Sequence, residues 1–222
     1  MSASDWTVAV PVKRLSAAKS RLRGAVSDAV HEELVLAMVR DTVTAIGSCE
    51  QVGEVMVVTD DSRVAAAVDA LGARVVPDPG GGLNAAMRFG ADTVAGPGRP
   101  RAVLTGDLPA LRPAELGAAL LATGPGRGFV ADAAGTGTVL LAAGTSCALD
   151  PHFGPGSAAA HAASGALALI GDWPGLRHDV DTAADLRAVL AIGAGEHTCG
   201  LLRDIGLIAQ CDASRVSTAR PR

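Results

Sequence analysis

The first half of the chain alternates short apolar runs with helix-like segments, and this alternation limits the fold more than any other feature. The apolar runs lie at residues 6–10, 54–59, 74–76 and 101–105. Helical patterns follow them at about 28–46, 62–70, 83–94 and from Pro113 onward. Strands that alternate with helices build a parallel sheet with helices on both faces. The sequence therefore predicts a Rossmann-like α/β fold.

The second half is more irregular. Short strands are expected at 128–131, 137–142 and 166–169, between glycine-rich turns, and a helix is expected at 183–192. We find no internal repeat, and we expect one domain over residues 1–211. Residues 212–222 are polar and end in Arg-Pro-Arg, which predicts a disordered tail.

Composition excludes several classes of function. Of the 222 residues, 49% are hydrophobic, which excludes wholesale disorder. Aromatic residues make up only 2% and the net charge is −4, so neither a stacking platform for single-stranded nucleic acid nor a broad phosphate-tracking surface is expected. The longest uncharged stretches, 133–149 and 151–171, contain glycine with threonine or proline, which argues against a membrane span.

The four cysteines show no metal-site or redox spacing. Cys49, Cys147, Cys199 and Cys211 form no CxxC pair, and they are expected to be reduced thiols in a cytoplasmic protein. The first six residues lack a basic region followed by an apolar run, so no signal peptide is expected.

A basic segment follows the first apolar run. Five cations fall within the eleven residues 13–23, in a chain that is otherwise acidic. They could clamp a polyphosphate, or they could form the solvated face of a helix. Because ligands bind beyond the carboxyl ends of parallel strands, the position of this segment favours the clamp.

Two acidic segments are candidates for a metal site. Asp107 lies in a Gly- and Pro-flanked loop after the fourth run, where it could hold a divalent cation or simply stabilise a turn. Asp179 and Asp181 would point the same way from an extended segment and would repel each other unless a cation joined them. Alternatively, Asp181 or Thr182 begins a helix as its N-cap, with Asp185 completing a capping box, but this leaves Asp179 unused.

Two glycine-rich turns are candidates for binding a small anion. Residues 135–138 (GTGT) and 153–157 (FGPGS) offer backbone N–H groups and hydroxyls, which suit a phosphate or a carboxylate. Ser157 could equally be the N-cap of a following helix. The chain has no GxGxxG after its first strand, no P-loop and no GxSxG elbow, which excludes the corresponding dinucleotide, P-loop and hydrolase sites.

Taken together and in this order, these segments resemble a known family. They are PVKRLSAAKSRL (11–22), LNAA (83–86), GDLPAL (106–111), GTGT (135–138), FGPGS (153–157) and DVDT (179–182). They are similar to the 2-phospho-L-lactate / phosphoenolpyruvate guanylyltransferase family of coenzyme F-420 biosynthesis, over about residues 6–190. The first and fifth segments carry most of the specificity, because strings like GDLPAL and DVDT occur in many nucleotidyltransferases.

The resemblance implies a glycosyltransferase-A-like nucleotidyltransferase with a mixed, mostly parallel sheet. It implies GTP as donor, Mg²⁺ as cofactor, release of pyrophosphate, and a small phosphorylated carboxylic acid as acceptor, either phosphoenolpyruvate or 2-phospho-L-lactate. The high content of Ala, Gly and Arg suits an actinobacterial genome, and the acceptor of actinobacterial-type members is thought to be phosphoenolpyruvate.

The resemblance also assigns expected roles to individual residues. The triphosphate would be gripped by Lys13, Lys19 and Arg21, which with Asp107 make up the expected catalytic set. Mg²⁺ would be held by Asp107 with Asp179 or Asp181. The acceptor would be bound by Thr138, Gly154 and Ser157, and the nucleotide by Leu83 and Asn84. For Asn84 the alternative is the N-cap of the helix that follows the triple glycine.

Two rival functions remain open at the level of sequence. One is a nucleotidyltransferase for another phosphorylated substrate, such as a molybdopterin or 3-phosphoglycerate. The other is a non-catalytic GTP-binding regulator, which the acidic residues argue against because a sensor needs no metal-bridged reaction centre. The sequence leaves the oligomeric state open, with a homodimer as one candidate.

Overall fold

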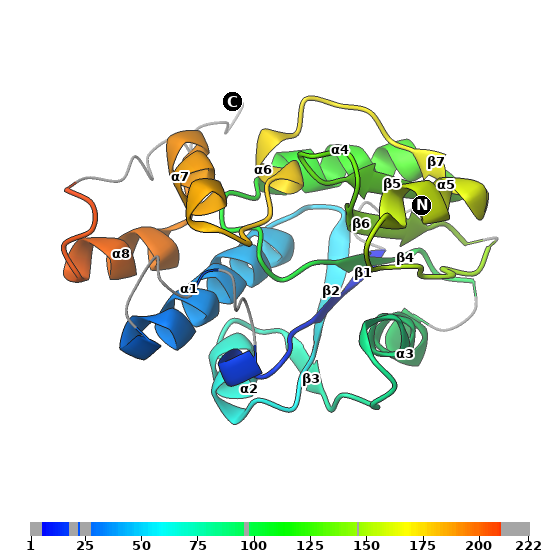
Figure 1. The fold of residues 1–222 in the computed structure, drawn as a ribbon. Helices are drawn as coiled ribbons and strands as arrows, with labels where there is room; N and C mark the ends of the chain where they lie inside the picture. The colour runs from blue at the N-terminus through cyan, green and yellow to red at the C-terminus, as the bar shows by residue number, and fades with distance from the viewer. Residues whose placement is uncertain (1–5, 18–21, 23–27, 96–97, 146, 210–222) are drawn as a thin grey trace, which may run out of the picture.

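The computed structural model describes residues 6–17, 22, 28–95, 98–145 and 147–209 (Figure 1). Seven strands form one sheet in the order β3-β2-β1-β4-β6-β5-β7. The strands are β1 (Trp6–Pro11), β2 (Val52–Val58), β3 (Arg74–Val76), β4 (Arg101–Leu104), β5 (Arg127–Ala131), β6 (Thr138–Ala143) and β7 (Leu167–Ala168).

One strand runs against the others. β6 pairs antiparallel with both β4 and β5, whereas every other pair of neighbours is parallel. The sheet is therefore mixed and mostly parallel, which confirms the predicted fold class. The predicted tail, residues 212–222, lies outside the described residues.

Helices cover both faces of the sheet. They are η1 (Leu15–Ala17, 3₁₀), α1 (Asp28–Gly47), α2 (Ser62–Asp69), α3 (Leu83–Ala95), α4 (Pro113–Thr123), α5 (Ser157–Ala163), α6 (Pro174–Arg177), α7 (Ala183–Ile192) and α8 (Glu196–Asp204). The main core lies between the sheet and α1, α2, α4 and α6–α8, and a second core lies under α3 and α5. In Figure 1, α3 and α4 lie on opposite sides of the sheet.

Alternate side chains of β1 pack into these two cores. Val8 and Val10 are buried in the main core, and Ala9 is buried in the second. Such a strand needs apolar residues on both faces, which explains its continuous apolar run. On the second face, a Cβ at Gly90 would lie 2.7 Å from Val58 Cγ2 and 3.0 Å from Ala9 Cβ, so glycine lets α3 pack closely on the sheet.

The antiparallel direction of β6 decides which loops come together. β1 and β4 end at the same edge of the sheet, and β6 begins there, because Leu104 pairs with Leu140 and Thr105 N donates to Val139 O at 3.0 Å. This carboxyl edge therefore collects the segment after β1, the loop after β4 and the start of β6.

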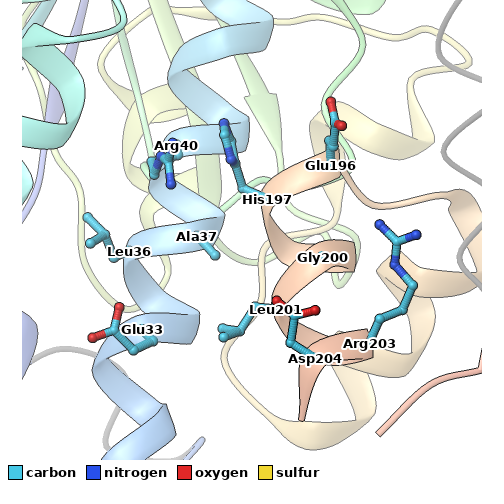
Figure 2. Close-up of a pocket in the computed structure, with 10 residues that line it drawn as sticks. All are labelled: Glu33, Leu36, Ala37, Arg40, Glu196, His197, Gly200, Leu201, Arg203 and Asp204. Atoms are coloured by element: carbon cyan, nitrogen blue, oxygen red, sulfur yellow. The ribbon is translucent and has the colours of Figure 1, made fainter. Parts of the chain in front are cut away.

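Away from this edge, α1 and α8 lie side by side (Figure 1). The Asp41 carboxylate accepts hydrogen bonds from the backbone N–H groups of His197 (2.9 Å) and Thr198 (2.8 Å), in the first turn of α8. A pocket of about 380 Å³ lies between the two helices. Figure 2 shows the side chains that line it. Its lining includes Glu33, Arg40, His197 and Arg203, and none of the site residues predicted from the sequence.

The cysteines differ in state. Cys49 and Cys147 are free, as expected. Cys199 is disulfide-bonded, so the expectation of four reduced thiols is wrong at this residue. A disulfide depends on closeness in space, which spacing along the chain does not report. Cys211 lies outside the described residues.

Within the part of the chain that the structure describes, no helix combines the length and the apolar character that a membrane span needs.

Candidate active site

Three aspartates from two distant segments meet at the carboxyl edge. Asp107, Asp179 and Asp181 each offer an oxygen, and these atoms all lie within 4.8 Å of one another. Val180 N donates to Asp107 O at 3.1 Å, which joins the two segments, and the Val180 side chain is buried in the main core. Asp179 and Asp181, which flank Val180, therefore both lie on the side of the segment opposite the Val180 side chain, as the period of two predicts. Three carboxylates at this spacing fit a hard divalent cation that prefers oxygen ligands.

A threonine of α1 fixes the loop that carries Asp107. The fully buried Thr42 hydroxyl donates to Met38 O at 2.9 Å and lies 3.4 Å from Gly106 O, and it accepts from Leu108 N at 3.0 Å. Nothing in the sequence singled out Thr42. Its only signal was a polar side chain among the apolar positions of a helix.

Gly106 brings the same loop close to the end of β1. A Cβ at Gly106 would lie 3.2 Å from both Val10 Cγ1 and Val12 Cγ2. The loop therefore packs directly against the residues that precede Lys13. Lys13 and Arg14 are exposed and lie outside any helix, so for them a solvated helical face is the wrong interpretation. Lys19 and Arg21 lie outside the described residues.

Asp61, just before α2, holds the basic segment in place through a hydrogen bond from Leu15 N. Its carboxylate caps α2 through Arg63 N (2.9 Å) and Val64 N (3.2 Å), and it also accepts from Leu15 N at 2.9 Å. Burial alone would raise the pKa of Asp61, but these three N–H donors and the nearby Arg63 charge outweigh it and hold the pKa below its ordinary value.

The two glycine-rich turns also meet. Ala158 N donates to Thr136 O at 3.1 Å, and the Thr138 hydroxyl lies 2.9 Å from Nδ1 of His161 in α5. Thr138 and Ser157 are 6% and 2% exposed. Gly154 has φ 140°, and a Cβ there would meet nothing within 4 Å, so this side of the turn is open. The structure thus gathers the predicted acceptor residues Thr138, Gly154 and Ser157.

The GTGT turn differs from the expectation in its backbone. The N–H groups of Thr136 and Gly137 donate to the Asp132 carboxylate, both at 2.9 Å, and Gly135 N donates to Asp132 O at 3.1 Å. These donors are therefore engaged within the turn and are not open for an anion. What this turn can still offer are the hydroxyls of Thr136, which is exposed, and of Thr138.

Three helix starts were predicted with alternatives, and the structure decides between them. The N-cap of α5 is Gly156 in the left-handed conformation (φ 71°), so Ser157 is not the cap. Thr182 caps α7 and forms a capping box with Asp185, so Asp181 is not the cap either. Ser157 and Asp181 therefore have no capping role that would explain their presence.

Asn84 is not an N-cap either, because α3 begins one residue earlier, at Leu83. Its amide instead holds the second glycine-rich turn. Oδ1 accepts from Phe153 N at 2.7 Å, and Nδ2 donates to Phe153 O at 3.0 Å. Leu83 packs against the second core. Both residues thus lie next to the FGPGS turn (153–157), a link that sequence spacing could not reveal, and their contact with a nucleotide stays a prediction.

The chain matches the family model described as "Guanylyl transferase CofC like" over residues 6–220. A phosphoenolpyruvate guanylyltransferase of Salinispora arenicola is 61% identical over 202 residues, covering 88% of this chain and 94% of the relative. One of Geodermatophilus obscurus is 56% identical over 205 residues, covering 89% and 94%.

Solved structures share the fold at low identity. A nucleotidyl transferase from Methanothermobacter thermautotroptrophicus has a TM-score of 0.61 at 22% identity, covering 84% of this chain and 97% of that one. A cytidylyltransferase from Leptospira borgpetersenii has a TM-score of 0.56 at 12% identity, with 99% of each chain covered. Sequence and fold agree, and the chain belongs to the CofC-like guanylyl transferase family.

Proposed function

We propose that this protein transfers GMP from GTP to the phosphate of phosphoenolpyruvate and releases pyrophosphate, as a step in coenzyme F-420 biosynthesis. The names of its relatives support this acceptor, at 50–61% identity for the first four. Within the molecule, the observation that carries the proposal is the cluster of Asp107, Asp179 and Asp181 beside the glycine-rich turns.

The reaction needs positioning and charge neutralisation more than covalent chemistry. An oxygen of the acceptor phosphate attacks the α-phosphorus of GTP in line. A bond from that oxygen to the α-phosphorus forms, the bond from the α-phosphorus to the bridging oxygen breaks, and the β- and γ-phosphates leave as pyrophosphate.

Mg²⁺ would be held by Asp107 together with Asp179 or Asp181, all three of which lie in the acidic cluster. When bound, the ion neutralises charge between nucleotide and acceptor. The chain contributes the fixed geometry of these carboxylates. The Thr42 contacts hold the Asp107 loop, and the bond from Val180 N to Asp107 O holds the two acidic segments together.

The basic segment would bind the triphosphate. Lys13 is exposed beyond β1, next to the Asp107 loop, where its charge can stabilise the departing pyrophosphate. We assign the same task to Lys19 and Arg21 from their place in the motif. Leu83 and Asn84 would lie on the nucleotide side.

The acceptor would bind between the two glycine-rich turns. Hydroxyls of Thr138 and Ser157 would donate to its phosphate or carboxylate, and the open side of Gly154 would let it approach the backbone. These donors lie at the carboxyl edge together with the aspartates, which is where the attacking oxygen must be.

A pyrophosphate-release assay tests the proposal. The purified protein is incubated with Mg²⁺, with GTP, CTP or ATP, and with phosphoenolpyruvate, 2-phospho-L-lactate or 3-phosphoglycerate. We expect release with GTP and phosphoenolpyruvate above all other pairs. A preference for CTP or for another acceptor would point to a different nucleotidyltransferase, and GTP binding without release with any acceptor would indicate a regulator.

A further inference from the structure

A buried histidine lies beneath the proposed acceptor turns and has no part in the mechanism above. His161 is fully buried, and both of its ring nitrogens have partners. Nδ1 lies 2.9 Å from Thr138 Oγ1, and Nε2 accepts from His152 N at 2.9 Å. The Phe153 ring packs edge-on against it, with ring centroids 5.0 Å apart. His161 thus contacts both the start of β6 and the segment that leads into Gly154.

The backbone contact decides which nitrogen carries the proton. A backbone N–H can only donate, so Nε2, which faces the N–H of His152, has no proton. In a neutral ring the proton is then on Nδ1, and Nδ1–H donates to Thr138 Oγ1. A hydroxyl that accepts this bond keeps its own hydrogen for another acceptor.

That direction is what an anionic ligand requires. The oxygens of a phosphate or a carboxylate only accept, so a threonine that donated to the ring would turn its lone pairs toward them. The described residues provide no second partner for the Thr138 hydroxyl. We propose that His161 is a positioning residue of the acceptor site, which orients the hydroxyl of Thr138 as a donor to the bound acid. The inference rests on the proposed function, which places that acid against Thr138.

The ring must stay neutral for this arrangement. An imidazolium would carry a proton on both nitrogens, and its Nε2–H would then face the N–H of His152. Burial, followed by the charges of His152 and Arg127, lowers the pKa of His161 to about 4, while Asp150 and a hydrogen bond to the Ser157 backbone act in the opposite direction. At neutral pH the ring is therefore an uncharged donor to Thr138.

The first test needs no enzymatic activity. Long-range ¹H–¹⁵N spectra of the ¹⁵N-labelled wild-type protein report the tautomer of each histidine, and the signals missing in His161→Phe identify this one. We expect the Nδ1–H tautomer at neutral pH. An Nε2–H tautomer or a charged ring would overturn the inference, whether or not the protein turns over substrate.

The second test separates positioning from a general structural role. His161→Phe keeps an aromatic ring in the core but removes both nitrogens. We expect the KM for phosphoenolpyruvate to rise about ten-fold, the effect of one hydrogen bond, with the KM for GTP unchanged. Thr138→Val should raise the same KM, and the double variant should have no higher KM than Thr138→Val alone, because each single variant already lacks the bond between His161 and Thr138. The bond from His152 N is lost only with His161, and its loss should appear in the melting temperature. His31→Phe, which replaces another buried histidine on α1, is the matched control and should leave both KM values unchanged.

The outcomes distinguish this inference from the proposed function. Equal rises in both KM values, or additive losses in the double variant, would mean that His161 only supports the fold. An unchanged KM in Thr138→Val would reject the acceptor site itself. If the wild-type protein released no pyrophosphate, the proposed function would fail, and calorimetric titration with phosphoenolpyruvate would then apply the same comparison to binding alone.

Discussion

Asp107 is the residue on which the proposed chemistry depends most. Asp107→Asn should leave the fold intact, because the loop is held by Thr42 and by backbone bonds. Turnover should fall by roughly a hundredfold or more, since part of the charge that holds the cation is lost. The measurement is turnover at saturating Mg²⁺ together with the melting temperature, with the exposed Asp69→Asn as control. Near-normal turnover would remove Asp107 from the site.

Ser157 separates a binding role from a structural one. Because Gly156 caps α5, Ser157→Ala should leave the melting temperature close to that of the wild type. It should raise the KM for phosphoenolpyruvate by a factor that corresponds to about 1–3 kcal/mol, the range for one hydrogen bond to a charged group. GTP binding should not change. A lower melting temperature with an unchanged acceptor KM would return Ser157 to a role in the fold.

At the scale of residues, the sequence identified groups whose chemistry follows from residue type and spacing. The period of two in DVDT predicted that Asp179 and Asp181 share a side, and the structure brings Asp107 to them. Thr42 and His161 could not be found in this way. Their roles depend on contacts with Leu108 and Thr138, which are far from them in sequence.

At the scale of elements, α1 stabilises the loop after β4. Thr42→Val preserves the side-chain shape but leaves Leu108 N–H without its acceptor, which should cost about 1–3 kcal/mol of unfolding free energy. The looser loop should also raise the Mg²⁺ concentration needed for half-maximal activity, and Thr42→Ser should restore it. Denaturant unfolding and Mg²⁺ titration check both effects. A stability loss without a change in Mg²⁺ dependence would mean that Thr42 does not position Asp107.

The Asp61 anchor predicts a pH dependence. Its pKa is lowered in the folded state, so the stability it contributes is present above the ordinary value of 3.8 and is lost as pH falls through the lowered pKa. Asp61→Ala should therefore be less stable than the wild type at pH 7, by about 1 kcal/mol for a lost helix cap. The difference in stability between the wild type and Asp61→Ala should become smaller below pH 3.8. Melting temperatures of both proteins, measured from pH 7 to below pH 3.8, check this, and a constant difference would contradict the stabilising role of the Asp61 carboxylate.

Elements with a strong periodic pattern were predictable. The helix expected at 183–192 has those bounds, and each strand was placed within about two residues. The sequence did not predict α6 or α8. α6 has only four residues and begins with Pro-Gly. The start of α8 is fixed by Asp41, whose carboxylate lies more than 150 positions away in the chain.

At the scale of the whole molecule, the position of β6 matters most. Alternating strands and helices predict a parallel sheet, but they do not say that one later strand inserts antiparallel between β4 and β5. The mixed sheet was expected only from the family resemblance. That insertion places Thr138 at the same edge as Asp107, so the proposed acceptor and metal sites are neighbours because of topology.

Tracing the phosphates of GTP tests the central claim most directly. The protein is incubated with Mg²⁺, phosphoenolpyruvate and GTP labelled with ³²P at either the α or the γ position, and the products are separated. We predict that the α label moves into a new compound that also contains phosphoenolpyruvate, and that the γ label appears in pyrophosphate. Transfer of the γ label to the acid, or an α label that leaves GTP only as free GMP, would contradict the account.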